Sequence, residues 1–133
     1  VKNFAVSNRS GTVEMAVARD DGNWLSGCSH VISDNHMGYK LSSHPDRQGD
    51  FEEKITVPCV TLSYVMSFVS HVDFLKIDTE GHELNIIMDY SFILKPRFIK
   101  IEHKHVDDTL ISSKLEENGY LVWTEKDDIY GLI

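Results

Sequence analysis

Phe74-Leu75-Lys76-Ile77-Asp78 and Phe98-Ile99-Lys100-Ile101-Glu102 are two copies of one pattern, a short apolar run that ends on a carboxylate. Residues 79–97 between them can hold a loop, a helix and a second loop, which is the order of a βαβ unit. A right-handed crossover would place the two strands side by side and parallel. Asp78 and Glu102 should then share the carboxyl edge of the sheet, where ligands bind in open α/β sheets. Carboxylates that only cap helices or face water are the alternative interpretation.

The overall composition excludes several classes of protein. The chain has 133 residues, enough for one small domain, and its formal net charge of −8 argues against a nucleic-acid partner. No apolar run approaches the roughly 20 residues of a membrane span. Cys28 and Cys59 form neither a C-x-x-C pair nor a disulfide framework. A reduced, cytoplasmic compartment is therefore the default expectation.

The first part of the chain predicts strands. Residues 3–7 read as a short buried strand, and residues 12–18 alternate between apolar and polar side chains. The polar turn that ends at Gly11 lies between them, so the two are expected to form a hairpin. Residues 53–57 resemble an edge strand that Pro58 ends, because proline has no N–H to donate.

Residues 23–50 form the least regular stretch. They have no sustained period, and long irregular loops in compact domains are usually functional or disordered. We therefore expect a mobile loop there. Three of the seven histidines, His30, His36 and His44, fall in this stretch, but their spacing fits no standard metal motif. Surface histidines are the expected outcome.

The second part of the chain alternates helices and strands. Apolar residues at helical spacing predict helices at 61–69, from about Thr79 as far as Leu94, and at 109–117. Thr79 or a neighbour is expected to cap the second helix, and Asp107 or Asp108 the third. Residues 120–124 and 129–133 read as a terminal hairpin. The fold class is therefore α/β, a mainly parallel sheet with an antiparallel pair at its end.

The strongest chemical signal is the stretch from Lys76 to Glu83, which leaves a strand and enters a helix with Gly81 in the connecting turn. It is not a phosphate loop, because it has no Gly-Lys-Ser/Thr. It is not a nucleophile elbow either, since no Gly-x-Ser-x-Gly occurs. His82-Glu83 lacks the second histidine of a His-Glu-x-x-His zinc site.

The segment Asp73-Phe74-Leu75-Lys76-Ile77-Asp78-Thr79-Glu80-Gly81-His82-Glu83 resembles the hallmark of FkbM-type S-adenosylmethionine-dependent methyltransferases, roughly D-F-[LVI]-K-[IL]-D-[VTI]-E-G-x-E. The resemblance extends over nearly the whole chain. Further similar segments are Phe4-Ala5-Val6-Ser7 with Gly11, Ser26 to Ser29, Val57 to Leu62, Pro96 to Glu102, and Asn118-Gly119-Tyr120. One departure is Ser63, where the family often has Asp.

The resemblance implies an incomplete class I methyltransferase (Rossmann-like) sheet, whose full strand order is 3-2-1-4-5-7-6. Residues 1–133 would be the C-terminal portion of one methyltransferase domain, with strands 3–7 present. Strands 1 and 2, which carry the glycine-rich cofactor loop, have no counterpart, and the chain starts at Val1 rather than at Met. We expect this piece alone to bind the cofactor weakly or not at all, and to be inactive. Its exposed sheet edge at strand 4 could support self-association.

The same resemblance implies transfer of a methyl group from S-adenosylmethionine to an oxygen of a small molecule or a sugar. It places Ser7 and Asp78 at the cofactor. It makes Asp78, Glu80, Glu102 and His103 the candidate catalytic residues, with Glu102 or His103 as the general base.

Three alternatives remain open for these residues. Asp78, Glu102 and His103 could bind Mg²⁺, because a hard cation relieves the repulsion of neighbouring carboxylates. Asp78 and Glu102 could instead only form hydrogen bonds to the backbone at the sheet edge. The chain could also be a degenerate, non-catalytic module that binds a partner.

Overall fold

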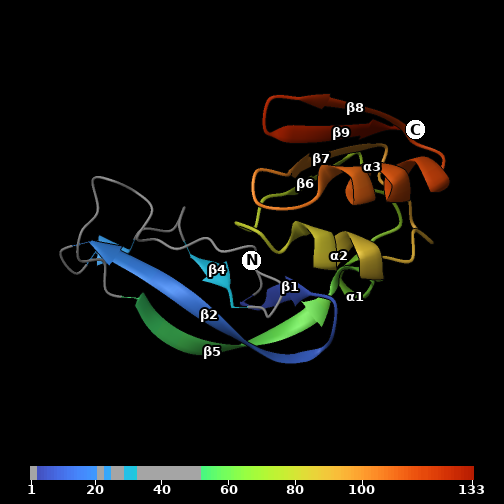
Figure 1. Ribbon diagram of the computed structural model, residues 1–133. Helices are drawn as coiled ribbons and strands as arrows, with labels where there is room; N and C mark the ends of the chain where they lie inside the picture. Colours follow the sequence, from blue (N-terminus) through green and yellow to red (C-terminus); the bar gives the residue numbers. More distant parts are fainter. Residues whose placement is uncertain (1–2, 21–22, 25–28, 33–51) are drawn as a thin grey trace.

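The computed structural model describes residues 3–20, 23–24, 29–32 and 52–133, which form two β-sheets and three helices (Figure 1). The α/β class is therefore confirmed. In chain order the elements are β1 (Ala5–Ser7), β2 (Gly11–Asp20), β3 (Asn23–Trp24), β4 (His30–Val31), β5 (Glu52–Thr61), α1 (Leu62–Met66), β6 (Phe74–Ile77), α2 (Glu83–Asp89), β7 (Phe98–Glu102), α3 (Asp108–Glu117), β8 (Leu121–Glu125) and β9 (Asp128–Leu132).

The C-terminal sheet has the strand order β6-β7-β9-β8. β6 and β7 are parallel, and their register pairs Phe74 with Phe98 and Ile77 with Ile101, so the two copies of the sequence pattern lie side by side as predicted. β9 runs antiparallel to both β7 and β8. This order agrees with the predicted 4-5-7-6 block. The incomplete Rossmann-like sheet with strands 3–7 stays a prediction, because β1, which covers the strand expected at residues 3–7, pairs with β5 in a different sheet.

The main core lies between the C-terminal sheet and the helices α2 and α3, which Figure 1 shows on one face of that sheet. The side chains of β7 alternate between this face and the opposite one. Ile99 and Ile101 are fully buried in the core, whereas Phe98 and Lys100 are not. The core consists of Leu62, Met66, Ile77, Ile86, Ile87, Tyr90, Phe92, Ile99, Ile101, Ile111, Leu115, Tyr120 and Ile129.

The opposite face of the C-terminal sheet carries stacked aromatic side chains. The ring centroids of Phe74 and Phe98 are 5.5 Å apart, those of Phe98 and Tyr130 are 6.0 Å apart, and those of Tyr130 and Trp123 are 5.4 Å apart. Phe74 is 54% exposed. Among the described residues β6 pairs only with β7, so β6 is an edge strand, as predicted for strand 4.

The N-terminal sheet differs from the predicted hairpin. β1 does not pair with β2; it runs parallel to β5, and β5 lies between β1 and β2. β2 and β5 are the longest strands, and their antiparallel register runs from Gly11 opposite Cys59 to Ala18 opposite Glu52. The hairpin prediction was wrong because a strand about 40 residues further along the chain pairs with both of its members.

Pro58 does not end the strand, contrary to the prediction. β5 continues to Thr61 and is a central strand, not an edge strand. Pro58 lies opposite Thr12 on β2, but the pairing of β1 with β5 starts only at Cys59. At Pro58, β5 therefore has a strand neighbour on one side only, where a missing N–H is tolerated.

The stretch at 23–50 is partly ordered into short strands. β3 and β4 both pair with β2, and His30 on β4 is only 6% exposed, so the expectation of a surface histidine was wrong for this residue. Its burial follows from its position opposite Ala16 in the sheet. His36, His44 and most of the predicted mobile loop lie outside the described residues.

Three helices form where the sequence predicts them, but two of them are shorter than predicted. α1 ends at Met66, and α2 begins only at Glu83 and ends at Asp89. The chain leaves α2 because Tyr90 is extended and Phe92 has a φ of +53°. The predicted capping by the side chain of Thr79 or a neighbour is not formed, since His82 occupies the N-cap of α2 without a side-chain capping bond.

The cap of α3 was predicted correctly and offers a test of local stability. The Asp107 side chain accepts hydrogen bonds from the backbone N–H groups of Thr109 (2.9 Å) and Leu110 (3.3 Å). Asp107→Ala should lower the free energy of unfolding by about 1 kcal/mol in urea titrations, because it removes both bonds. Asp107→Asn should change it by only a few tenths. An Asn variant as unstable as the Ala variant would contradict this role.

Candidate functional site

The carboxyl edge of the β6–β7 pair carries the two carboxylates that the sequence places there. Asp78 directly follows β6 and Glu102 is the last residue of β7. The Asp78 carboxylate accepts a hydrogen bond from Lys76 Nζ at 2.6 Å, and both side chains are substantially exposed. Asp78 is thus held in a surface ion pair.

The turn after Asp78 is folded around the buried side chain of Glu83, which is 1% exposed. Its Oε1 accepts hydrogen bonds from the N–H and the hydroxyl of Thr79, the latter at 2.8 Å. Its Oε2 accepts the N–H of Gly81 at 2.9 Å. This turn requires positive φ angles, +55° at Glu80 and +108° at Gly81. Glu83 therefore fixes where the Glu80 side chain emerges.

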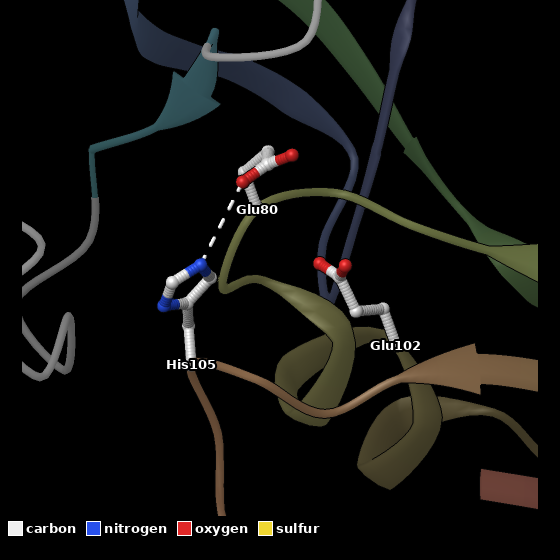
Figure 2. A group of neighbouring side chains, drawn as sticks. All are labelled: Glu80, Glu102 and His105. Carbon is white, nitrogen blue, oxygen red and sulfur yellow. Dashed lines mark ion pairs between the residues drawn. The ribbon is translucent and has the colours of Figure 1, made fainter. Parts of the chain in front are cut away.

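Glu80, Glu102 and His105 form the group of candidate ligand atoms at this edge. One ligand atom of each lies within 4.8 Å of the others, and all three side chains are partly buried. Figure 2 shows the three side chains converging from the β6–α2 turn, the end of β7 and the loop that follows β7. Nε2 of His105 is 3.7 Å from a carboxylate oxygen of Glu80.

The structure does not bring His103 into this group. Its Nε2–H donates a hydrogen bond to the carbonyl of Lys126 at 3.1 Å, and its backbone N–H donates to the carbonyl of Asp127. Both contacts hold His103 against the β8–β9 turn. His105 was not predicted as a site residue. The only sequence signal for it was the repeated histidine in His103-Lys104-His105, which does not say which ring faces Glu80.

The pKa of Glu102 is shifted by its surroundings. Burial raises its pKa above the usual glutamate value, and the negative charges of Asp78, Glu80 and Glu83 raise it further. A carboxylate with a raised pKa is a stronger base once it is deprotonated. This property suits a group that accepts a proton.

The raised pKa of Glu102 predicts a pH dependence of stability. In the native state the charged form is disfavoured, so the folded protein loses stability as the pH rises from the unfolded-state pKa to the higher folded-state pKa. Glu102→Gln removes this loss. Relative to the wild type, the variant should therefore gain stability in urea titrations as the pH is raised through this window. A stability difference that is independent of pH would contradict the shift.

The Glu80–Glu102–His105 group has the donors of a metal site, although it differs from the predicted set of Asp78, Glu102 and His103. Two carboxylates and one imidazole suit Mn²⁺, Fe²⁺ or Zn²⁺ better than Mg²⁺, which prefers oxygen ligands. The imidazole would serve as a ligand only in its neutral form.

Two cavities adjoin the N-terminal sheet. A polar cavity of about 370 Å³ is bounded by Ser7 and by His82 and Asn85 of the α2 region. A larger cavity of about 800 Å³ has mostly apolar walls from β1, β2, β4 and β5, with Asp78 and Thr79 at its rim. Ser7, predicted at the cofactor, is 1% exposed, and its hydroxyl lies 3.0 Å from Nε2 of His82.

A parallel strand pair with carboxylates at its carboxyl edge lies next to two cavities, an arrangement typical of the small-molecule sites of α/β domains. Residues 1–122 match the family model of the methyltransferase FkbM domain. The chain therefore belongs to the FkbM methyltransferase family. No curated protein and no solved structure matches it at the level of significance applied. In the described part of the chain, no helix has the length and apolar character needed to cross a membrane.

Proposed function

We propose that the protein transfers the methyl group of S-adenosylmethionine to a hydroxyl oxygen of a small molecule or sugar. The sulfonium of this donor already activates the methyl group, so the protein has to align the acceptor oxygen and remove its proton. The observation that carries the proposal is Glu102, a carboxylate with a raised pKa at the carboxyl edge, directly beside Glu80 and His105.

The positions of the residues support separate roles. Glu102 serves as the general base. His105 lies 3.7 Å from the carboxylate of Glu80 and helps to position it or passes a proton to it. Asp78 lines the larger cavity, where we place the methyl end of S-adenosylmethionine. His103 is engaged with the β8–β9 turn, so we assign it no role in the chemistry. Ser7 shapes the wall of the polar cavity through its contact with His82.

A divalent cation is the second candidate for proton removal, favoured by the convergence of Glu80, Glu102 and His105. A bound cation would acidify the acceptor hydroxyl. Dialysis against a chelator should then abolish methyl transfer, and Mn²⁺ should restore it better than Mg²⁺. Unchanged activity after dialysis would leave Glu102 as a metal-free base.

Calorimetry with S-adenosylmethionine tests the function directly. The titration compares this chain with a version that includes the coding sequence upstream of Val1, followed by transfer of labelled methyl to a panel of hydroxylated acceptors. We expect the extended version to bind more tightly and to transfer methyl. Failure of both versions to bind would contradict the proposal and favour a non-catalytic module, whereas equally tight binding by both would contradict the expected weakness of the shorter chain.

A further inference from the structure

The polar cavity of about 370 Å³ combines hydrogen-bonding groups from one turn and three secondary-structure elements. Asn8 and Arg9 come from the β1–β2 turn, Thr12 and Glu14 from β2, Thr56 from β5, and Asn85 from α2. Only Val13, Val31 and Ile32 are apolar among its lining residues. Its volume is at the lower end of the range for small-molecule sites, about 300 Å³ and above. It is a pocket for a small and polar ligand.

A network of four hydrogen-bonded side chains, two of them buried, holds one wall of this cavity in place. His82 is 3% exposed and Ser7 is 1% exposed. Asn85 donates to Nδ1 of His82 (3.1 Å), Nε2 of the same ring lies 3.0 Å from the Ser7 hydroxyl, and that hydroxyl donates to Oδ1 of Asn8 (3.2 Å). These hydrogen bonds link α2 to the β1–β2 turn across the cavity wall. The amides of Asn85 and Asn8 are therefore oriented before a ligand binds.

The charges and hydrogen-bonding groups of the cavity indicate the chemistry of its ligand. Arg9 and Glu14 carry opposite charges, so the lining has no excess positive charge for a phosphate. Two amides and two threonine hydroxyls offer both donors and acceptors. Sugar hydroxyls also donate and accept at the same atom, so this mixed and charge-balanced lining fits an uncharged sugar ring.

We infer that this cavity binds a neutral monosaccharide unit of the methyl acceptor, an assignment that rests on the proposed function. The cavity is connected in sequence to the proposed catalytic residues, because the turn that carries Glu80 ends at His82, which lines the cavity. Glu83 fixes this turn from one side and the His82–Ser7 contact fixes it from the other. Glu80 is thus only two residues along the chain from His82, which lines the cavity.

Sugar binding can be measured on this chain without any methyl transfer. We would titrate it with methyl glycosides of glucose, galactose, mannose and rhamnose and follow backbone amide resonances by NMR. Glucuronate, glucose 6-phosphate and inorganic phosphate serve as charged probes. The amides of Thr12, Thr56 and Asn85 should shift with at least one neutral glycoside.

Two variants and a matched control test the assignment. Asn85→Ala should weaken binding of that glycoside about tenfold and Thr56→Val about fivefold, because each removes a hydrogen-bonding group from the cavity. Thr124→Val, at an exposed threonine of β8 that does not line the cavity, should leave the affinity unchanged.

Three results would overturn the inference. These are no response of the cavity amides to any neutral glycoside, a response to the charged probes only, or binding that Asn85→Ala and Thr56→Val do not weaken. The proposed function is tested separately, since methyl transfer from S-adenosylmethionine to a non-sugar acceptor would support the function while overturning this assignment.

Discussion

Glu83→Ala should lower the free energy of unfolding by about 3 kcal/mol or more and should also displace Glu80. The Glu83 carboxyl group is buried and accepts three hydrogen bonds, two from Thr79 and one from Gly81. Hydrogen bonds to charged groups contribute about 1.5–3 kcal/mol each, and the substitution leaves two backbone donors without their partner. Urea titration followed by circular dichroism measures the loss.

Glu83→Gln separates the charge of Glu83 from its shape. The glutamine side chain has the size of the glutamate side chain, but its NH₂ group replaces one carboxylate oxygen. That NH₂ donor would face the donor groups of either Thr79 or Gly81, so we expect this variant to be unstable as well. Glu117→Ala, at an exposed glutamate of α3, is the control and should change stability by less than about 0.5 kcal/mol.

Thr79→Val keeps the prediction testable if both Glu83 variants fail to fold, because it removes one of the three hydrogen bonds and should lower the free energy of unfolding by about 1.5 kcal/mol or more. Glu83→Ala with wild-type stability would show that the turn does not depend on this carboxyl group.

The strand pair was predictable because its two halves share one short pattern in the same register, Phe74 with Phe98 and Ile77 with Ile101. The pairing of β1 was not predictable in the same way. The turn at Gly11 is a real local signal, but β5 enters between β1 and β2 from far along the chain. Local patterns do not indicate such a long-range insertion.

The candidate site was predictable only as far as the strands extend. Glu102 ends β7, so its place at the edge follows from the sheet. Glu80 reaches the same edge through a turn with two positive φ angles, whose course is fixed by the buried Glu83. His105 rather than His103 faces Glu80 because the backbone turns between them, with the N–H of Val106 bonded to the carbonyl of His103. Neither turn has a periodic sequence signal.

Glu102→Gln should lower kcat/KM for methyl transfer in the intact protein by about 10²- to 10⁴-fold, the usual contribution of a general base. The amide keeps the size of the side chain but no longer accepts the acceptor's proton. In the wild type, activity should fall as the pH drops through the pKa of Glu102, which lies above the usual glutamate value because of burial and the neighbouring carboxylates. That limb of the pH profile should be absent from the residual activity of the variant.

Glu125→Gln is the matched control, because Glu125 is an exposed glutamate at the end of β8 and does not belong to the acidic group. It should leave kcat/KM and the pH profile unchanged. His105→Gln tests whether the imidazole of His105 could be the base instead, since this change should lower the rate less than Glu102→Gln if Glu102 accepts the proton. If Glu102→Gln keeps the wild-type rate while His105→Gln loses it, the base is the imidazole, and the carboxylates serve to hold it in place.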